Sequence, residues 1–148
     1  MNVDLVAFLR RMLDADEQAA RDASAGPWWA EDTSPRRWGE ERDAEVASSQ
    51  GRVALLDHDR NGDLNAEHVA RWDPARVLAE VEAKRKIMAE AFHHAATIDS
   101  EWGCCHDAEE IEQGMCPDHR PDELALLRLL AALYKSEPGY RPEWAPGT

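Results

Sequence analysis

Apolar residues recur every three or four positions in three stretches of the chain, which is the spacing of one face of an α-helix. The three predicted helices cover about residues 3–22, 74–97 and 122–136. In the first two, the apolar residues form one broad face, whereas in the third they occupy most of the circumference. We therefore expect the third helix to be central and buried. The apolar positions are Leu5, Leu9, Met12, Leu13, Val77, Leu78, Val81, Met88, Ala91, Phe92, Ala95, Leu124, Leu126, Leu127, Leu129, Leu130, Leu133 and Tyr134.

The second helix has a well-defined start signal. Asp73 suits the N-cap because its side chain can accept a hydrogen bond from the first turn, and Pro74 suits the first helical position, where no N–H group is needed. Glu82 and Lys86 lie four residues apart, in the order that favours an ion pair on the helix surface. These features predict a helix that begins at residue 74 and ends near Thr97.

Between the first two helices, the pattern changes to short runs of β-prone residues. Residues 45–56 predict a hairpin that turns near Gly51, and the segment at Trp28 can add a third strand. Trp28, Trp29 and Trp38 lie in this region, and we interpret them as side chains that cover a small sheet.

The predicted fold class is α+β, mainly α. Three long helices pack with a small antiparallel hairpin or sheet at about residues 28–56, and a Cys/His loop at about residues 100–120 is inserted between the last two helices. With 148 residues, the chain is expected to form a single domain, 1–148.

The charge of the chain narrows the classes of function. With 30 Asp and Glu against 17 Lys and Arg, the formal net charge is −13 at pH 7. Such a chain lacks the clustered Lys and Arg that bind nucleic-acid phosphates, so we expect no direct nucleic-acid binding. A protein partner of unknown identity is expected instead, and an acidic surface favours a basic one. Oligomeric state is left open by the sequence.

The chain shows no signal for a membrane or for secretion. No apolar run approaches the length of a membrane-spanning helix, and the first residues lack a basic n-region and an apolar h-region. The three cysteines cannot all pair within one chain, and clustered thiols in a reducing compartment are more typical of metal binding. We therefore expect a cytoplasmic protein without membrane association.

All three cysteines and two of the six histidines lie in residues 104–119, which we call the Cys/His segment. A structural zinc ion takes four Cys or His ligands, and the spacing of Cys116 and His119 is that of a zinc knuckle. The predicted zinc ligands come from Cys104, Cys105, His106, Cys116, His119 and His94. The alternative is two buried structural cysteines, one exposed thiol and surface histidines. Between the two halves, residues 107–114 predict one helical turn with a glycine stop.

A second metal motif is incomplete. Asp57, Asp59 and Asn61 match the first three ligand positions of an EF-hand calcium loop, and Gly62 matches its turn. However, His68 stands where a bidentate Glu is needed, and the residues before the loop predict a strand rather than an entering helix. Calcium binding is therefore not expected.

Residues 72–85 (WDPARVLAEVEAKR) and 138–144 (PGYRPEW), with residues 4–9 and 26–28, are similar to an uncharacterised family. Its members are small acidic proteins of actinobacteria and their phages. The family is a domain of unknown function, so the resemblance implies no activity. It does imply a histidine at the end of the long helix and cysteines before the last helix. The matching positions are His93 or His94, Cys104 or Cys105, and Cys116.

Motifs of common enzymes are missing from the sequence, including His-Glu-x-x-His, a glycine-rich phosphate loop and Gly-x-Ser-x-Gly. We expect a non-enzymatic small protein, encoded by a bacterium or a phage, that carries a structural zinc site and acts through protein contacts. Two alternatives stay open. One is an acidic inhibitor or nucleic-acid mimic that binds a basic protein surface. The other is a zinc hydrolase in which Glu109 or Glu110 acts beside an open zinc position.

Overall fold

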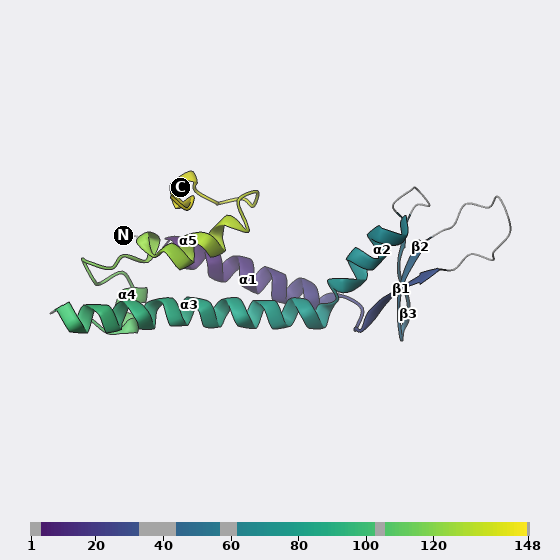
Figure 1. The fold of residues 1–148 in the computed structure, drawn as a ribbon, viewed down its shortest axis with the longest axis horizontal. Coiled ribbons are helices and arrows are strands. Elements are labelled where there is room, and N and C mark those ends of the chain that lie inside the picture. The colour runs from purple at the N-terminus through teal and green to yellow at the C-terminus, as the bar shows by residue number, and fades with distance from the viewer. Residues whose placement is uncertain (1–3, 33–43, 57–61, 103–105, 148) are drawn as a thin grey trace. The chain divides into compact units, whose positions relative to one another are not determined.

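A computed structural model describes residues 4–32, 44–56, 62–102 and 106–147. It contains the helices and strands of an α+β fold, mainly α, which confirms the predicted class (Figure 1). In chain order they are α1 (Asp4–Asp22), β1 (Trp28–Asp32), β2 (Ala44–Ser48), β3 (Gly51–Leu56), α2 (Gly62–Arg71), α3 (Pro74–Trp102), α4 (Ala108–Glu112), the 3-10 helix η1 (Pro121–Glu123), α5 (Ala125–Ala132) and the 3-10 helix η2 (Pro142–Trp144). Within these ranges, no helix combines the length and apolarity needed to cross a membrane.

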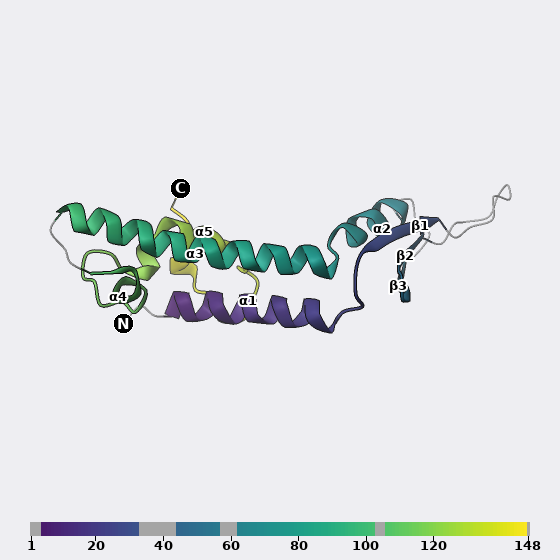
Figure 2. The ribbon, with the colours of Figure 1, turned by 90° about the horizontal axis from the view of Figure 1, so that it is seen from below.

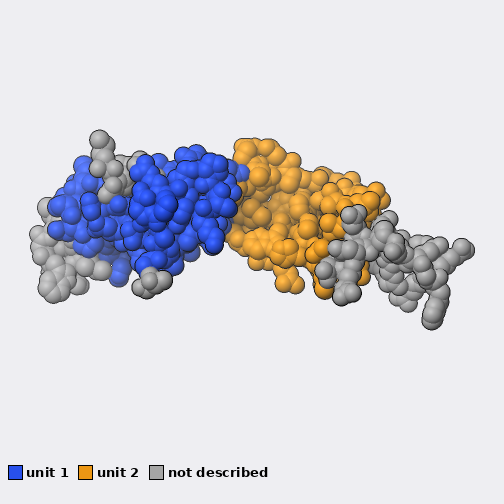
Figure 3. Space-filling model, turned by 90° about the horizontal axis from the view of Figure 1, so that it is seen from above, with its two compact units in different colours: residues 1–15, 81–148 blue, residues 16–80 orange. Residues whose placement is uncertain are grey.

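The chain divides into two compact units (Figure 3). Unit 1 comprises Met1–Ala15 and Val81–Thr148, and unit 2 comprises Asp16–Glu80. The unit boundaries fall inside α1 and α3, so both helices contribute residues to both units. The prediction of a single domain stays a prediction.

Large apolar side chains form the core of unit 1. The predicted stripe of α1 is buried there, with Leu5, Leu9 and Leu13 at most 1% exposed. In this unit α1 runs alongside α3 (Figure 2), and Asp14 and Arg85 form an ion pair at 2.7 Å. Other large buried side chains come from α3, α4, α5 and the segment after them. They are Val81, Met88, Phe92, Ile111, Leu127, Tyr134 and Trp144.

The proline-rich tail packs on unit 1 through its aromatic rings. The Trp144 ring centroid lies 5.1 Å from that of Phe8, and Trp144 is 4% exposed. Phe8 also meets Tyr134 edge-on at 6.4 Å and Tyr140 at 6.1 Å. Edge-to-face contacts at these distances are favourable beyond the area they bury. One aromatic cluster therefore joins α1, the segment that follows α5, and η2.

Helix α3 starts where the sequence predicts and ends later. Oδ1 of Asp73 accepts a hydrogen bond from the backbone N–H of Arg76 at 2.9 Å, which confirms the predicted N-cap. The helix continues past Thr97 to Trp102. The hydroxyl of Thr97 donates to the carbonyl of His93 at 3.0 Å, a bond within the helix that leaves its backbone ladder intact. Residues 75–102 contain no Gly or Pro, so the sequence supplies no such stop signal at residue 97.

Two expectations for the last helix are wrong. Leu124 is extended, with φ −68° and ψ 116°, so residues 121–123 form a separate 3-10 turn and α5 begins at Ala125. The helix is also not central. Leu127 and Ala131 are fully buried, but Leu126, Leu129 and Leu133 are 45%, 55% and 63% exposed. Leucine on every side cannot indicate which side faces the core, because the pattern is nearly uniform around the axis.

Unit 2 is an antiparallel sheet with strand order β1-β2-β3 and helix α2 packed on it. The predicted hairpin and third strand are thus confirmed. Gly51, the first residue of β3 after the turn from β2, has φ +120°, a conformation that favours glycine. The core is small. Ala44, Val46 and Ala66 are at most 1% exposed, and partly buried apolar residues surround them: Trp28, Val53, Ala54, Leu56, Val69 and Ala70.

The tryptophans of unit 2 divide between packing and exposure. Trp28 packs on the sheet core, as predicted, and its Nε1 donates to the Ser24 carbonyl at 2.9 Å. Trp29 is 39% exposed, and Trp38 lies outside the described residues. Asp57, Asp59 and Asn61 of the EF-hand-like run also lie outside them, whereas Gly62 begins α2.

Candidate metal site

Helix α4 shapes the middle of the Cys/His segment. Oδ1 of Asp107 accepts the N–H of Glu110 at 2.9 Å, and Oε2 of Glu110 accepts the N–H of Asp107 at 2.9 Å. This reciprocal capping box fixes the start of the turn. At its end, Gly114 has φ +74°, and the N–H of Met115 returns to the Glu110 carbonyl at 2.9 Å. With Ile111 fully buried, the predicted turn and glycine stop are confirmed.

Cys116 and His119 follow this reversal. Cys116 is 1% exposed and belongs to the buried core of unit 1. His119 is half-buried, and its Nδ1 atom is screened from solvent. A thiol and an imidazole three residues apart are thus both held inward by a segment whose backbone is fixed by α4. Burial of this kind suits a closed ligand set and equally suits ordinary packing.

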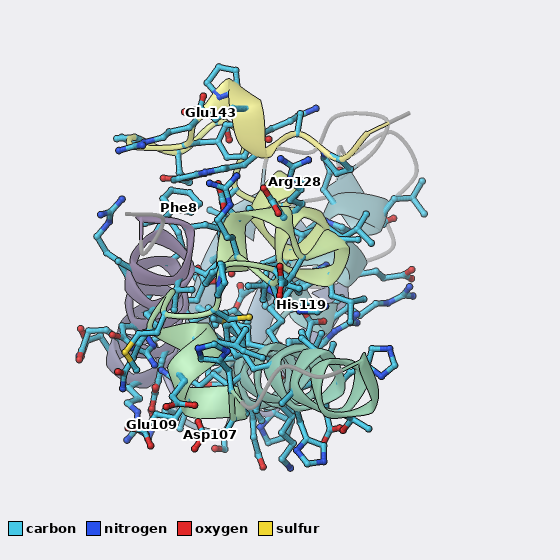
Figure 4. The ribbon with its side chains drawn as sticks, turned by 90° about the vertical axis from the view of Figure 1, so that its left-hand side faces the viewer. Phe8, Asp107, Glu109, His119, Arg128 and Glu143 are labelled. Atoms are coloured by element: carbon cyan, nitrogen blue, oxygen red, sulfur yellow. The ribbon has the colours of Figure 1, made fainter. Side chains whose placement is uncertain are left out.

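His94 and His119 line the same cavity. The cavity has a volume of about 180 Å³, and His94 reaches it from α3 while His119 reaches it from the Cys/His segment. Figure 4 shows His119 between α3 and α5. The remaining lining is apolar: Ala91, Ala95, Leu124, Ala125 and Leu126. Both His93 and His94 are exposed, but only His94 is part of this lining. Of the two adjacent histidines, His94 is therefore the one placed near the segment.

The other predicted ligands are less completely described. His106 is half-buried and lies directly before the N-cap of α4. Cys104 and Cys105 lie outside the described residues. Among the residues that are described, no group of three or more His, Cys, Asp and Glu side chains is placed to hold a metal ion. The six-residue ligand set therefore stays a prediction.

The acidic residues of α4 are engaged locally. Glu110 completes the capping box, and Oε1 of Glu109 accepts a hydrogen bond from the Gln113 side chain at 3.1 Å. Neither glutamate lines the cavity shared by His94 and His119, and Figure 4 shows Glu109 well away from His119. A hydrolase would need one of these carboxylates beside a metal-bound water, and their local hydrogen bonds do not favour that role.

A second hollow of unit 1, of about 310 Å³, lies between α1, α3 and α4. Its rim carries two ion pairs, Arg10 with Glu112 and Arg85 with Asp14. The charges of this rim therefore balance one another. Its apolar lining is Leu13, Met88, Ala89 and Phe92. Among the described residues, no cysteine or histidine lines this hollow, so the Cys/His segment is the better candidate for a metal site.

Sequence reasoning missed the apolar surroundings of the two histidines. Ala91 and Ala95 are one helical turn apart on α3, and their small side chains leave room for the cavity beside His94. The pattern of small residues one turn apart is visible in the sequence. Which residues Ala91 and Ala95 face depends on the orientation of α5, and the leucine pattern did not indicate that orientation.

The model of a family described as "Family of unknown function (DUF6221)" matches residues 2–146, so the chain belongs to this family. The resemblance to an uncharacterised family is thus confirmed. The description gives no source organisms, and the actinobacterial and phage origin stays a prediction. No curated protein and no solved structure matches the chain.

Proposed function

We propose that this member of the family is a small non-enzymatic protein in which a structural zinc ion fixes the Cys/His segment between α3 and α5, and that it acts through protein contacts. One observation carries the proposal. His94 and His119, from distant parts of the chain, line one cavity, and Cys116 is buried three residues before His119.

The chemistry of these donors fits zinc. Thiolate sulfur and imidazole nitrogen are its usual protein ligands, and four of them make a closed structural site. Cys116, His119 and His94 would supply three ligands, and the rest would come from Cys104, Cys105 and His106. Bound zinc would contribute its binding free energy to folding, because the ligands are brought together only in the folded chain. A reducing cytoplasm would keep the thiols available for the metal.

A structural role is favoured over hydrolysis by the position of the carboxylates. Glu109 and Glu110 are used in the hydrogen bonds of α4, and neither lines the histidine cavity. A site closed by four protein ligands also leaves no position for a reactive water. The protein would then act by presenting a fixed surface to a partner.

The first experiment measures zinc by native mass spectrometry on the purified full chain. We expect one zinc ion per chain, and loss of zinc in C116S, H119A and H94A. The matched control is H93A, because His93 is adjacent to His94 and, like it, exposed, but lies outside the cavity lining. H93A should keep its zinc.

Absence of stoichiometric zinc in the wild-type chain would refute the proposal, and so would equal zinc content in H93A and H94A. X-ray absorption at the zinc edge separates the structural site from the hydrolase. Four sulfur and nitrogen ligands would support the structural site, whereas a water oxygen in the first coordination shell would favour the hydrolase.

A further inference from the structure

The hollow of about 310 Å³ in unit 1 combines an apolar floor with a charged rim. Helices α1, α3 and α4 surround it (Figure 4), and we call it the α1/α3 hollow. Its volume lies at the lower end of the roughly 300–1,000 Å³ that is typical of small-molecule pockets. Among the described residues, its lining has no member in common with the cavity of His94 and His119. The hollow is therefore separate from the candidate metal site.

The floor of the α1/α3 hollow suits an apolar group. Leu13, Met88 and Phe92 line it, although each of these side chains is at most 5% exposed. Ala89 is exposed and adds only a methyl group to the lining. An apolar side chain placed here is removed from water against three large apolar residues, which favours its binding.

The rim of the hollow carries four charges that alternate in sign and cancel. Arg10 and Asp14 lie one turn apart on α1, with their Cβ atoms about 5–6 Å apart, in the less favourable order for an ion pair within a helix. Each contacts another helix instead. Arg10 pairs with Glu112 of α4, and Asp14 pairs with Arg85 of α3. A cation and an anion of α1 are thus held side by side at the rim.

These ion pairs leave hydrogen-bonding capacity on both α1 residues. A guanidinium has five N–H donors, and a carboxylate accepts at two oxygens. The contact of Arg10 uses Nη2, and the contact of Asp14 uses Oδ1. Arg10 can therefore donate to the carboxylate of a ligand while Asp14 accepts from an ammonium group, and neither ion pair has to break.

We propose that the α1/α3 hollow binds a free α-amino acid with an apolar side chain, such as leucine. The ligand carboxylate accepts from Arg10, and the ligand ammonium group donates to Asp14. The ligand side chain packs on the floor formed by Leu13, Met88 and Phe92. A zwitterion adds no net charge to a rim whose own charges cancel, whereas an acid without an ammonium group is repelled by a chain of net charge −13.

The test is a titration of the full chain with L-leucine, followed by the NMR shifts of its backbone amides. We expect saturable shifts in residues 10–14 and 85–92, with a dissociation constant of about 1 mM or tighter. N-acetyl-L-leucine lacks the ammonium group and L-leucinamide lacks the carboxylate, so each should bind roughly tenfold more weakly. Glycine lacks the apolar side chain and should also bind roughly tenfold more weakly.

A matched pair of variants tests the location. A89F fills the hollow from its exposed edge and should weaken leucine binding roughly tenfold or more. The control is A83F, because Ala83 is also exposed on α3 but is not part of the lining. A83F should leave the dissociation constant unchanged.

A third variant separates ligand contact from a change in the fold. R10Q removes the donor for the carboxylate, so it should weaken L-leucine roughly tenfold but should not weaken L-leucinamide, which has no carboxylate to bind. Equal weakening of the two ligands would overturn the role of Arg10. The absence of saturable shifts with L-leucine would overturn the proposal. So would L-leucinamide or N-acetyl-L-leucine binding the wild-type chain as tightly as L-leucine, or A83F weakening binding as much as A89F.

Discussion

Large rings and leucines fill the core of unit 1, whereas alanine and valine form the centre of unit 2. In unit 1, Phe8, Leu127 and Trp144 are at most 4% exposed, while the unit 2 core centres on Ala44 and Val46. Hydrophobic stabilisation scales with the apolar area removed from water. Unit 1 therefore gains most from side-chain packing, and unit 2 depends more on the hydrogen bonds of its three-stranded ladder.

Polar groups show the same contrast. Strand β2 buries Glu45 and Ser48 together with its apolar residues. Nε of Arg52 lies 2.8 Å from Oε2 of Glu45, and the two groups form an ion pair without the geometry of a hydrogen bond. This ion pair offsets part of the free-energy cost of burying the Glu45 carboxylate. In unit 1, Cys116 is buried, and so are the Nδ1 atom of His119 and the Oδ1 atom of Asp122. The candidate site residues Cys116 and His119 therefore lie in unit 1, which has the larger apolar core.

Truncating one core side chain in each unit gives the largest expected effect. Phe8→Ala removes a ring with three aromatic neighbours and should lower the free energy of unfolding by about 3–5 kcal/mol. Val46→Ala removes two carbon atoms from the centre of unit 2 and should cost about 2 kcal/mol. Urea denaturation followed by circular dichroism measures both. Equal losses in the two variants would contradict the contrast in core size.

Removing the capping box of α4 should have a smaller effect on the free energy of unfolding. Here unit 1 also depends on hydrogen bonds, in this case between side chains and the backbone. Asp107→Ala leaves the N–H of Glu110 without its side-chain acceptor and should destabilise unit 1 by about 1 kcal/mol. Asp107→Asn keeps an acceptor and should recover most of the loss. The control is Asp118→Ala, because Asp118 is exposed and caps no helix in the described residues. The same loss in Asp107→Ala and Asp118→Ala would show that the capping box does not stabilise the segment.

The smallest effect is expected on the surface of α3. A hydrogen bond from Lys86, followed by its charge, lowers the pKa of the Glu82 carboxyl. Because the pKa of Glu82 is lower in the folded state, the stabilisation that its carboxylate gains from Lys86 is present above the unfolded pKa. It is lost as pH falls through the folded pKa. Lys86→Gln should raise the pKa of Glu82 toward its ordinary value, and it should leave the midpoint of urea unfolding at neutral pH unchanged because both side chains of the pair are exposed. Titration of the Glu82 carboxyl carbon by NMR measures the shift, and an unmoved pKa would contradict the assignment of its cause.

The sequence predicted the elements whose signals are local. The 3.6-residue periodicity gives α1 and α3, and Asp73 with Pro74 gives the start of α3, now seen in the hydrogen bond from Arg76. The turn and glycine stop of α4 were also predictable, since they depend on Asp107, Glu110 and Gly114 alone.

Features that depend on tertiary packing were not predictable. Leucines occur all around α5, so only the packing of unit 1 determines that Leu127 is buried and Leu129 is exposed. Likewise, the sequence predicts His94 as a ligand, but only the position of α3 against the Cys/His segment shows that His94 and not His93 lines the cavity. The chemistry of the side chains therefore gave six candidate ligands, but it could not select the four that a closed zinc site needs.

Amide hydrogen exchange with and without a zinc chelator tests the central claim, that zinc fixes the Cys/His segment of unit 1. We expect the chelator to speed exchange in residues 106–119 and at the start of α5, and to leave strands β2 and β3 of unit 2 unchanged. Identical exchange in residues 106–119 with and without the chelator would contradict the claim.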